Sequence, residues 1–157
     1  MRDRFTVLVV ESELIAQETI SATLREAASD GVFRVVNDGW EAMDYFDGQG
    51  EYGDRRKYPL PTHVLLSLRP SSPDGFALLE HLQEHPPART TPVFVLSPSV
   101  AAGEVERACR LGAYCYRVRP VSRAALVHEV RLLQFFWRMA RFPSARDGGW
   151  TGQGARI

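Results

Sequence analysis

Residues 62–75 read THVLLSLRPSSPDG, a short apolar segment followed by a turn rich in proline and serine. An apolar run of this length is typical of a strand that is covered on both faces, as in a parallel sheet. We therefore predict a strand over Val64–Ser67 and a helix from about Gly75 to His85, which the sequence HPP ends. Ser67 would stand at the tip of a buried strand, where side chains often meet ligands.

The same alternation of strand and helix extends in both directions along the chain. Apolar runs predict four further strands, over Phe5–Val10, Phe33–Val36, 91–97 and 113–118. Helices are expected after an N-cap at Ser12, over Trp40–Phe46, over Glu104–Leu111, and from a cap at Ser122 to about Phe142. The predicted fold class is α/β, a doubly wound five-stranded parallel sheet with five helices on its two faces.

Composition favours a single domain. At 157 residues the chain is long enough for one sizeable core, and two are not expected. Its apolar runs are too short to span a bilayer, and acidic residues interrupt the start before a signal peptide could form. Cys109 and Cys115 are expected to be reduced packing residues. These features predict a cytoplasmic protein without a membrane segment.

Charge is balanced overall but unevenly spread. The chain has 19 acidic and 19 basic residues, yet from Arg117 onward eight arginines accompany only Glu129 and Asp147. This basic end is either a solvated helix face with its tail, or a surface for an acidic partner.

The edge of the predicted sheet locates a candidate site before any motif is considered. In open parallel sheets, ligands bind at the carboxyl ends of the strands, near the point where the strand order reverses. The residues expected there are Glu11, Ser12, Ser67, Ser97 and Arg119.

The same segments resemble the receiver domains of two-component response regulators. VLVVESE resembles the family's first strand, which ends in an acidic pair, and HVLLSLRPSSPDG resembles the strand that carries the phosphorylated aspartate. PVFVLSPS resembles the strand with the switch hydroxyl, and LGAYCYRVRP the segment with the switch aromatic, a lysine and a proline. The loop before Pro61 and the ending QFFWRMARFP most resemble single-domain receivers associated with bacterial phytochromes. The resemblance covers about Thr6–Phe142 and implies the flavodoxin-like strand order 2-1-3-4-5.

The sequence departs from the family at the residues that carry its chemistry. Ser67 stands where the family has its phosphoacceptor aspartate, Ser12 stands in place of the second acidic residue, and Arg119 stands in place of the lysine. Ser97 and Tyr116 match the switch hydroxyl and the switch aromatic.

These departures change the charge of the expected pocket. Two carboxylates about 5 Å apart repel by roughly 3 kcal/mol at an effective dielectric constant of 20, so the family's acidic site needs Mg²⁺. Here Glu11 alone faces Arg119, and we predict a neutral, degenerate phosphoacceptor pocket with no metal and no other cofactor. Phosphorylation of Ser67 by a histidine kinase is not expected, because a serine hydroxyl is a poor nucleophile without an activating base and the metal.

The last predicted helix carries more apolar residues than one core-facing stripe needs. Leu126, Val130, Leu133 and Trp137 follow helical spacing and are expected in the core. A second set is expected to form a face for dimerisation or for a partner, unless it also packs internally. Its members are Leu132, Phe135, Phe136, Met139 and Phe142. We assign residues 1–142 to the receiver-like domain with an extended last helix, and 143–157 to a flexible C-terminal tail.

Catalysis is not expected from this sequence. His63 lies on the same strand face as Ser67, but at about 13 Å it is too far away for a Ser–His pair. LLSLR also lacks the flanking glycines of a nucleophile elbow.

The favoured function is a stand-alone receiver that acts as a phosphorylation-independent protein-interaction module. Its expected partners are a histidine kinase, another signalling protein or a second copy of the chain, as a homodimer through the C-terminal face. Two alternatives stay open: a nucleic-acid-associated regulator that uses the arginine-rich end, and a conventional phosphate-switched receiver with a different acceptor.

Overall fold

A computed structural model gives the structure of the chain and describes residues 5–27, 30–69, 71–85 and 88–139. The described residues contain one parallel sheet, in which the strands lie in the order β2-β1-β3-β4-β5. The strands are β1 (Thr6–Val10), β2 (Val32–Val36), β3 (His63–Ser67), β4 (Val93–Ser97) and β5 (Cys115–Val118). The helices are α1 (Leu14–Ala27), α2 (Gly39–Asp47), α3 (Asp74–Glu84), α4 (Ala102–Arg110) and α5 (Arg123–Met139), with 3₁₀ turns η1 (Gly50–Gly53) and η2 (Ala88–Thr90). The predicted fold class and strand order are confirmed.

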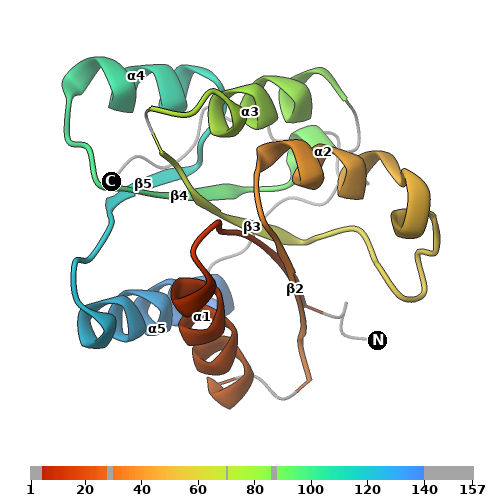
Figure 1. Cartoon of the computed structure of the whole chain (residues 1–157), viewed down its shortest axis with the longest axis horizontal. Helices are drawn as coiled ribbons and strands as arrows, with labels where there is room; N and C mark the ends of the chain where they lie inside the picture. The colour runs from red at the N-terminus through yellow and green to blue at the C-terminus, as the bar shows by residue number, and fades with distance from the viewer. Residues whose placement is uncertain (1–4, 28–29, 70, 86–87, 140–157) are drawn as a thin grey trace.

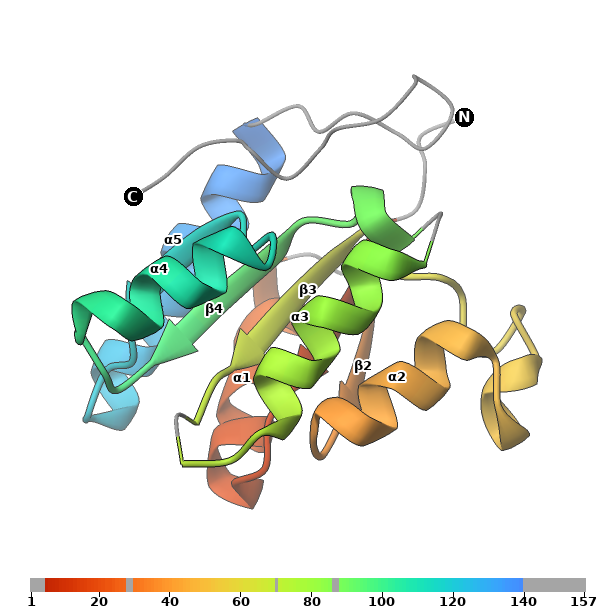
Figure 2. The same cartoon turned by 90° about the horizontal axis from the view of Figure 1, so that it is seen from above.

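The helices cover both faces of the sheet. Figure 1 shows α1 and α5 below the sheet and α2, α3 and α4 above it. Figure 2 shows that the three helices of the second group lie side by side. Both faces of the sheet are therefore shielded from water. For this reason the central strands are apolar at nearly every position rather than at alternate ones.

Each face has its own apolar core, and successive strand residues alternate between the two. Val7 and Val9 of β1 pack with Trp137 on the α1 and α5 side. Leu8 and Val10 pack into the cluster on the α2, α3 and α4 side. The core-facing stripe predicted for the last helix is confirmed for its described members, which are all buried: Leu126, Val130, Leu133 and Trp137.

Several local predictions can be compared with the structure. The Ser122 hydroxyl accepts the Ala125 N–H at 3.1 Å and caps α5 as expected, and Cys109 and Cys115 are free thiols. Within the described ranges no helix is both long enough and apolar enough to cross a membrane. Phe142 and the predicted tail over 143–157 lie outside the described residues.

The first turns of α2 and α3 touch. The Asp74 carboxylate accepts the Gly39 N–H at 2.7 Å, and a Cβ added at Gly39 would lie only 2.1 Å from the Asp74 carbonyl oxygen. A side chain of any size at position 39 would therefore push the two helix ends apart.

We expect Gly39→Ala to lower the free energy of unfolding by about 1–3 kcal/mol, the usual cost of overpacking a tight contact. Gly103→Ala is the matched control, because its added Cβ meets nothing within 4 Å and alanine favours the helix by about 0.5–1 kcal/mol. Urea denaturation of both variants measures the difference. Equal stability of the two would contradict the close approach.

Candidate functional site

The structure brings three of the predicted edge residues together. Glu11 follows the last residue of β1, Ser67 ends β3, and Arg119 follows the last residue of β5. The Ser67 hydroxyl donates to Glu11 Oε1 at 2.8 Å and accepts from Arg119 Nη1 at 2.8 Å. Arg119 Nη1 also lies 2.7 Å from Glu11 Oε1. We call these three residues the edge triad.

Both oxygens of the Glu11 carboxylate are engaged. Oε1 is held by Ser67 and Arg119, while Oε2 accepts the Glu13 backbone N–H at 3.1 Å. The Glu11 side chain is 2% exposed and that of Arg119 is 18% exposed. A buried carboxylate is stable only when it is paired and hydrogen-bonded, and the edge triad meets both conditions.

Glu13 adds a second carboxylate to the site, which the sequence analysis missed. Its Oε2 lies 3.6 Å from Arg119 Nη2, at the exposed side of the ion pair. The only signal in the sequence was its position two residues after Glu11. Arg119 is therefore drawn toward the end of β1 by two acidic side chains.

Ser12 is not part of the edge triad, and its predicted role as the N-cap of the first helix is wrong. Its side chain is exposed, and α1 begins at Leu14. The Glu13 carbonyl accepts the Gln17 N–H at 2.9 Å, so Glu13 occupies the N-cap position. The bond from the Glu13 N–H to the Glu11 carboxylate fixes the intervening turn, which delays the start of the helix.

Ser97 and Tyr116, the residues predicted as switch hydroxyl and switch aromatic, both bind the segment that follows β4. Ser97 is completely buried, and its hydroxyl accepts the Ser99 N–H at 3.2 Å. Tyr116 is 7% exposed, and its hydroxyl donates to the Ser99 carbonyl at 2.8 Å. The Arg119 N–H donates to the Ser97 carbonyl at 2.8 Å. A backbone hydrogen bond thus links Arg119 to Ser97, and the segment after Ser97 binds the hydroxyl of the buried Tyr116.

Asp74 is a further buried acidic residue beside this edge. It accepts hydrogen bonds from Gly39 N–H and from the Ser72 hydroxyl. Burial acts to raise its pKa, but these hydrogen bonds together with the charge of Arg69 hold the pKa of Asp74 below its usual value. Asp74 therefore serves as an ionised anchor between α2 and α3.

His63 belongs to the core rather than to a catalytic pair with Ser67. Its ring centroid lies 4.4 Å from that of Phe5 and 5.4 Å from that of Trp137. Burial lowers the pKa of His63 to about 3, which keeps the imidazole neutral at physiological pH. The neutral ring packs between aromatic side chains of the core, with its Nδ1 2.9 Å from the Thr62 hydroxyl.

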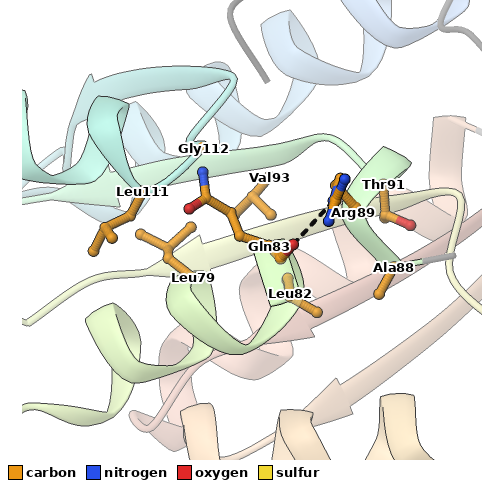
Figure 3. Close-up of a pocket in the computed structure, with 9 residues that line it drawn as sticks. All are labelled: Leu79, Leu82, Gln83, Ala88, Arg89, Thr91, Val93, Leu111 and Gly112. Atoms are coloured by element: carbon orange, nitrogen blue, oxygen red, sulfur yellow. Dashed lines mark hydrogen bonds between the residues drawn. The ribbon is translucent and has the colours of Figure 1, made fainter. Parts of the chain in front are cut away.

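The pocket shown in Figure 3 is remote from the edge triad. It lies at the opposite end of the sheet, beside Val93 at the start of β4, and its cavity volume is about 20 Å³. That volume holds about one water molecule. The Arg89 side chain crosses it to donate to the Gln83 carbonyl at 3.0 Å, so it offers no room for a ligand.

The strand order, together with an acidic residue after β1, a hydroxyl at the end of β4 and an aromatic on β5, is that of a receiver domain. No protein-family model matches the chain. The chain is, however, similar to response regulator Rcp1 from Synechocystis sp., with 27% identity over 83% of this chain and 87% of the relative.

Solved structures agree with this comparison. The phosphorylated cyanobacterial phytochrome response regulator RcpA aligns with 27% identity and a TM-score of 0.81, over 90% of this chain and all of that one. Response regulator RPA3017, from red-light signalling of R. palustris, aligns with 31% identity and a TM-score of 0.77, over 89% of this chain and 99% of that one. The chain belongs to the response-regulator receiver domains of two-component signalling and is related to the phytochrome response regulators.

We expect Arg119→Met to lower the free energy of unfolding by about 2–4 kcal/mol, because it leaves the Glu11 carboxylate buried without a counter-charge. The double variant E11Q/R119M should recover most of that loss, since it removes both charges. Arg131→Met is the control: its partner Glu26 is exposed and 3.7 Å away, so the loss should stay below about 1 kcal/mol. Denaturation at neutral pH measures all three. A double variant no more stable than Arg119→Met would show that Glu11 and Arg119 are not coupled.

Proposed function

We propose that this receiver is a phosphorylation-independent, non-catalytic protein-interaction module. The observation that carries the proposal is the position of the Arg119 guanidinium, 2.7 Å from Glu11 Oε1 and 2.8 Å from the Ser67 hydroxyl. The pocket is charge-balanced by the chain's own side chains. Phosphate and metal are then not needed to hold the edge of the sheet together. We also propose that it acts in the cytoplasm.

The family's divalent cation does not fit this set of donors. A solved structure of Rcp1, 26% identical with a TM-score of 0.78, is described as its Mn²⁺-bound form. In this chain Glu11 is the one carboxylate of the edge triad, and a guanidinium already binds the oxygen that a cation would use. Hard cations need several oxygen ligands, and a fixed positive charge at this distance repels them.

Ser67 does have a base within reach, which favours the conventional alternative. Its hydroxyl donates to Glu11 Oε1 at 2.8 Å, as a serine nucleophile donates to a general base. Yet the same oxygen also lies 2.7 Å from Arg119 Nη1, so the guanidinium already engages the atom that would accept the serine proton. A receiver that is switched by phosphate on Ser67 therefore remains the second candidate.

The contacts of Tyr116, the residue predicted as the switch aromatic, also support the proposal. Its hydroxyl donates to the Ser99 carbonyl and its ring is buried, so the inward arrangement is held by contacts within the chain. A partner that selects this arrangement would shift the population by its differential affinity alone.

The nucleic-acid alternative is weakened by the way the described arginines are used. Arg117 binds Glu129, Arg119 binds Glu11, Arg131 lies near Glu26, and Arg138 donates to the Ala27 carbonyl. A DNA-binding face needs cations that are available to phosphate groups. Arg117, Arg119 and Arg138 are thereby engaged within the chain, whereas Arg123 and Arg131 are exposed, so three of the five described arginines from Arg117 onward weigh against this alternative.

We predict that the chain gains no phosphoryl group from acetyl phosphate with Mg²⁺, as measured by intact mass. The variant S12D/S67D/R119K, which restores the family's residues at three positions, should gain one phosphoryl group under the same conditions. Ser71→Asp is the control for an added carboxylate on an exposed position of the β3–α3 loop. Phosphate recovered on Ser67 of the unmodified chain would overturn the proposal.

The face predicted for self-association is exposed in its described part. Phe135 is 66% exposed and Met139 is 71% exposed, with Leu132 beside them at 45%. Phe136 is 39% exposed and its ring also contacts Phe94 and Tyr114, so it belongs partly to the core.

We expect the chain to sediment as a homodimer and the variant L132Q/F135Q/M139Q to sediment as a monomer, because the substitutions remove apolar area from the contact face. V100Q/V121Q, which changes two exposed apolar residues elsewhere, should leave the dimer intact. A monomeric unmodified chain, or a dimer that survives the triple substitution, would contradict the assignment of this face.

A further inference from the structure

A second, basic depression lies at the opposite end of the sheet from the edge triad. Its volume is about 410 Å³, within the range of small-molecule sites. It is placed at the amino ends of β1 and β2, beside the segment that leads into β3 (Figure 1). The lining residues are Thr6, Val32, Arg34, Arg56, Lys57, Pro59, Leu60 and Thr62.

Three cations line this depression, and no described carboxylate forms an ion pair with them. Within the described ranges, the arginines that pair with carboxylates are Arg117, Arg119 and Arg131, all outside it. Arg56 and Lys57 are exposed and therefore accessible. The clustered positive charge attracts anions and is relieved by binding one.

Two nearby acidic residues are occupied by other groups. The Asp54 carboxylate accepts the Arg56 backbone N–H at 3.1 Å. The Glu51 carboxylate accepts the Tyr58 hydroxyl at 3.2 Å. Among the described residues, neither carboxylate forms an ion pair within 4.0 Å with Arg34, Arg56 or Lys57.

Two of the three cations, Arg34 and Lys57, contact the ring of Tyr58, and Arg34 also binds a backbone carbonyl. Arg34 donates from Nε and Nη2 to the Lys57 carbonyl at 3.2 and 2.8 Å. Its guanidinium lies 5.5 Å from the Tyr58 ring centroid, and the Lys57 ammonium lies 5.3 Å from the same centroid. These contacts use two of the five N–H donors of Arg34 and leave the others available.

The loop that carries Arg56 and Lys57 is itself fixed to α2. Arg55 donates to the carbonyls of Tyr45 and Phe46 at 2.8 and 2.7 Å. The Tyr45 hydroxyl donates to the Pro59 carbonyl at 2.8 Å. Burial raises the pKa of Tyr45 to about 12, so this donor keeps its proton at physiological pH. The basic depression is therefore formed before any ligand arrives.

We propose that this basic depression binds the phosphate group of a small organic molecule. A guanidinium fork together with a compact ammonium suits the oxygens of a phosphate. Val32, Pro59 and Leu60 provide apolar surface for the organic part of such a ligand. The site is separate from the edge triad, so ligand binding here does not depend on phosphorylation.

The test is an amide NMR titration of the full chain with phenyl phosphate and, separately, with inorganic phosphate, at constant ionic strength. We expect saturable shifts at Arg34, Lys57 and Thr62, with phenyl phosphate binding more tightly. R56Q/K57Q should weaken binding at least tenfold, whereas R110Q/R123Q, which removes two exposed charges elsewhere, should not change it.

The arms of the titration separate the possible outcomes. Equal affinity for the two probes would show that the apolar lining contributes nothing, and it would overturn the assignment of an organic ligand. The absence of saturable shifts with both probes would overturn the proposal. So would unchanged affinity in R56Q/K57Q, because binding would then not depend on the basic depression.

Discussion

A single buried carboxylate constrains the functional edge of this receiver. Glu11 is 3% exposed, and a carboxylate at that depth must find a positive charge and hydrogen-bond donors or become protonated. Arg119 supplies the charge, and the Ser67 hydroxyl and the Glu13 N–H supply the remaining bonds. The strand ends of β1, β3 and β5 are joined by these contacts, so the edge is closed by side chains that belong to the protein.

The edge triad is also connected to Ser97 and Tyr116. Arg119 is tied through its backbone to Ser97, and the segment after Ser97 holds the Tyr116 hydroxyl. RcpA has been solved in its phosphorylated form and Rcp1 with Mn²⁺ bound, whereas here an internal arginine occupies the position beside the acidic residue. The chain keeps the fold of the family, while the positive charge beside Glu11 comes from its own Arg119.

Much of this could be predicted from the sequence, and the failures have a common physical origin. The strands of the sheet were predictable because strands buried on both faces are apolar throughout, and Ser122 was a correct cap because capping is a local interaction. Glu11, Ser67 and Arg119 could be placed at one edge from the parallel topology alone. The start of α1 was not predictable from local pattern, because the Glu13 N–H binds the Glu11 carboxylate, which also pairs with Arg119, a residue distant in sequence. The contact between Gly39 and Asp74 likewise depends on two helix ends that are distant in sequence.

The most direct test of the central claim is whether a divalent cation can enter the edge triad. Paramagnetic line broadening by Mn²⁺ in amide NMR spectra reports the position of the ion. If Arg119 occupies the place of the cation, the amides of Glu11, Ser12, Ser67 and Leu68 should show no saturable, selective broadening at millimolar Mn²⁺. Saturable broadening centred on these four amides would show that the ion displaces the guanidinium, and it would contradict the account.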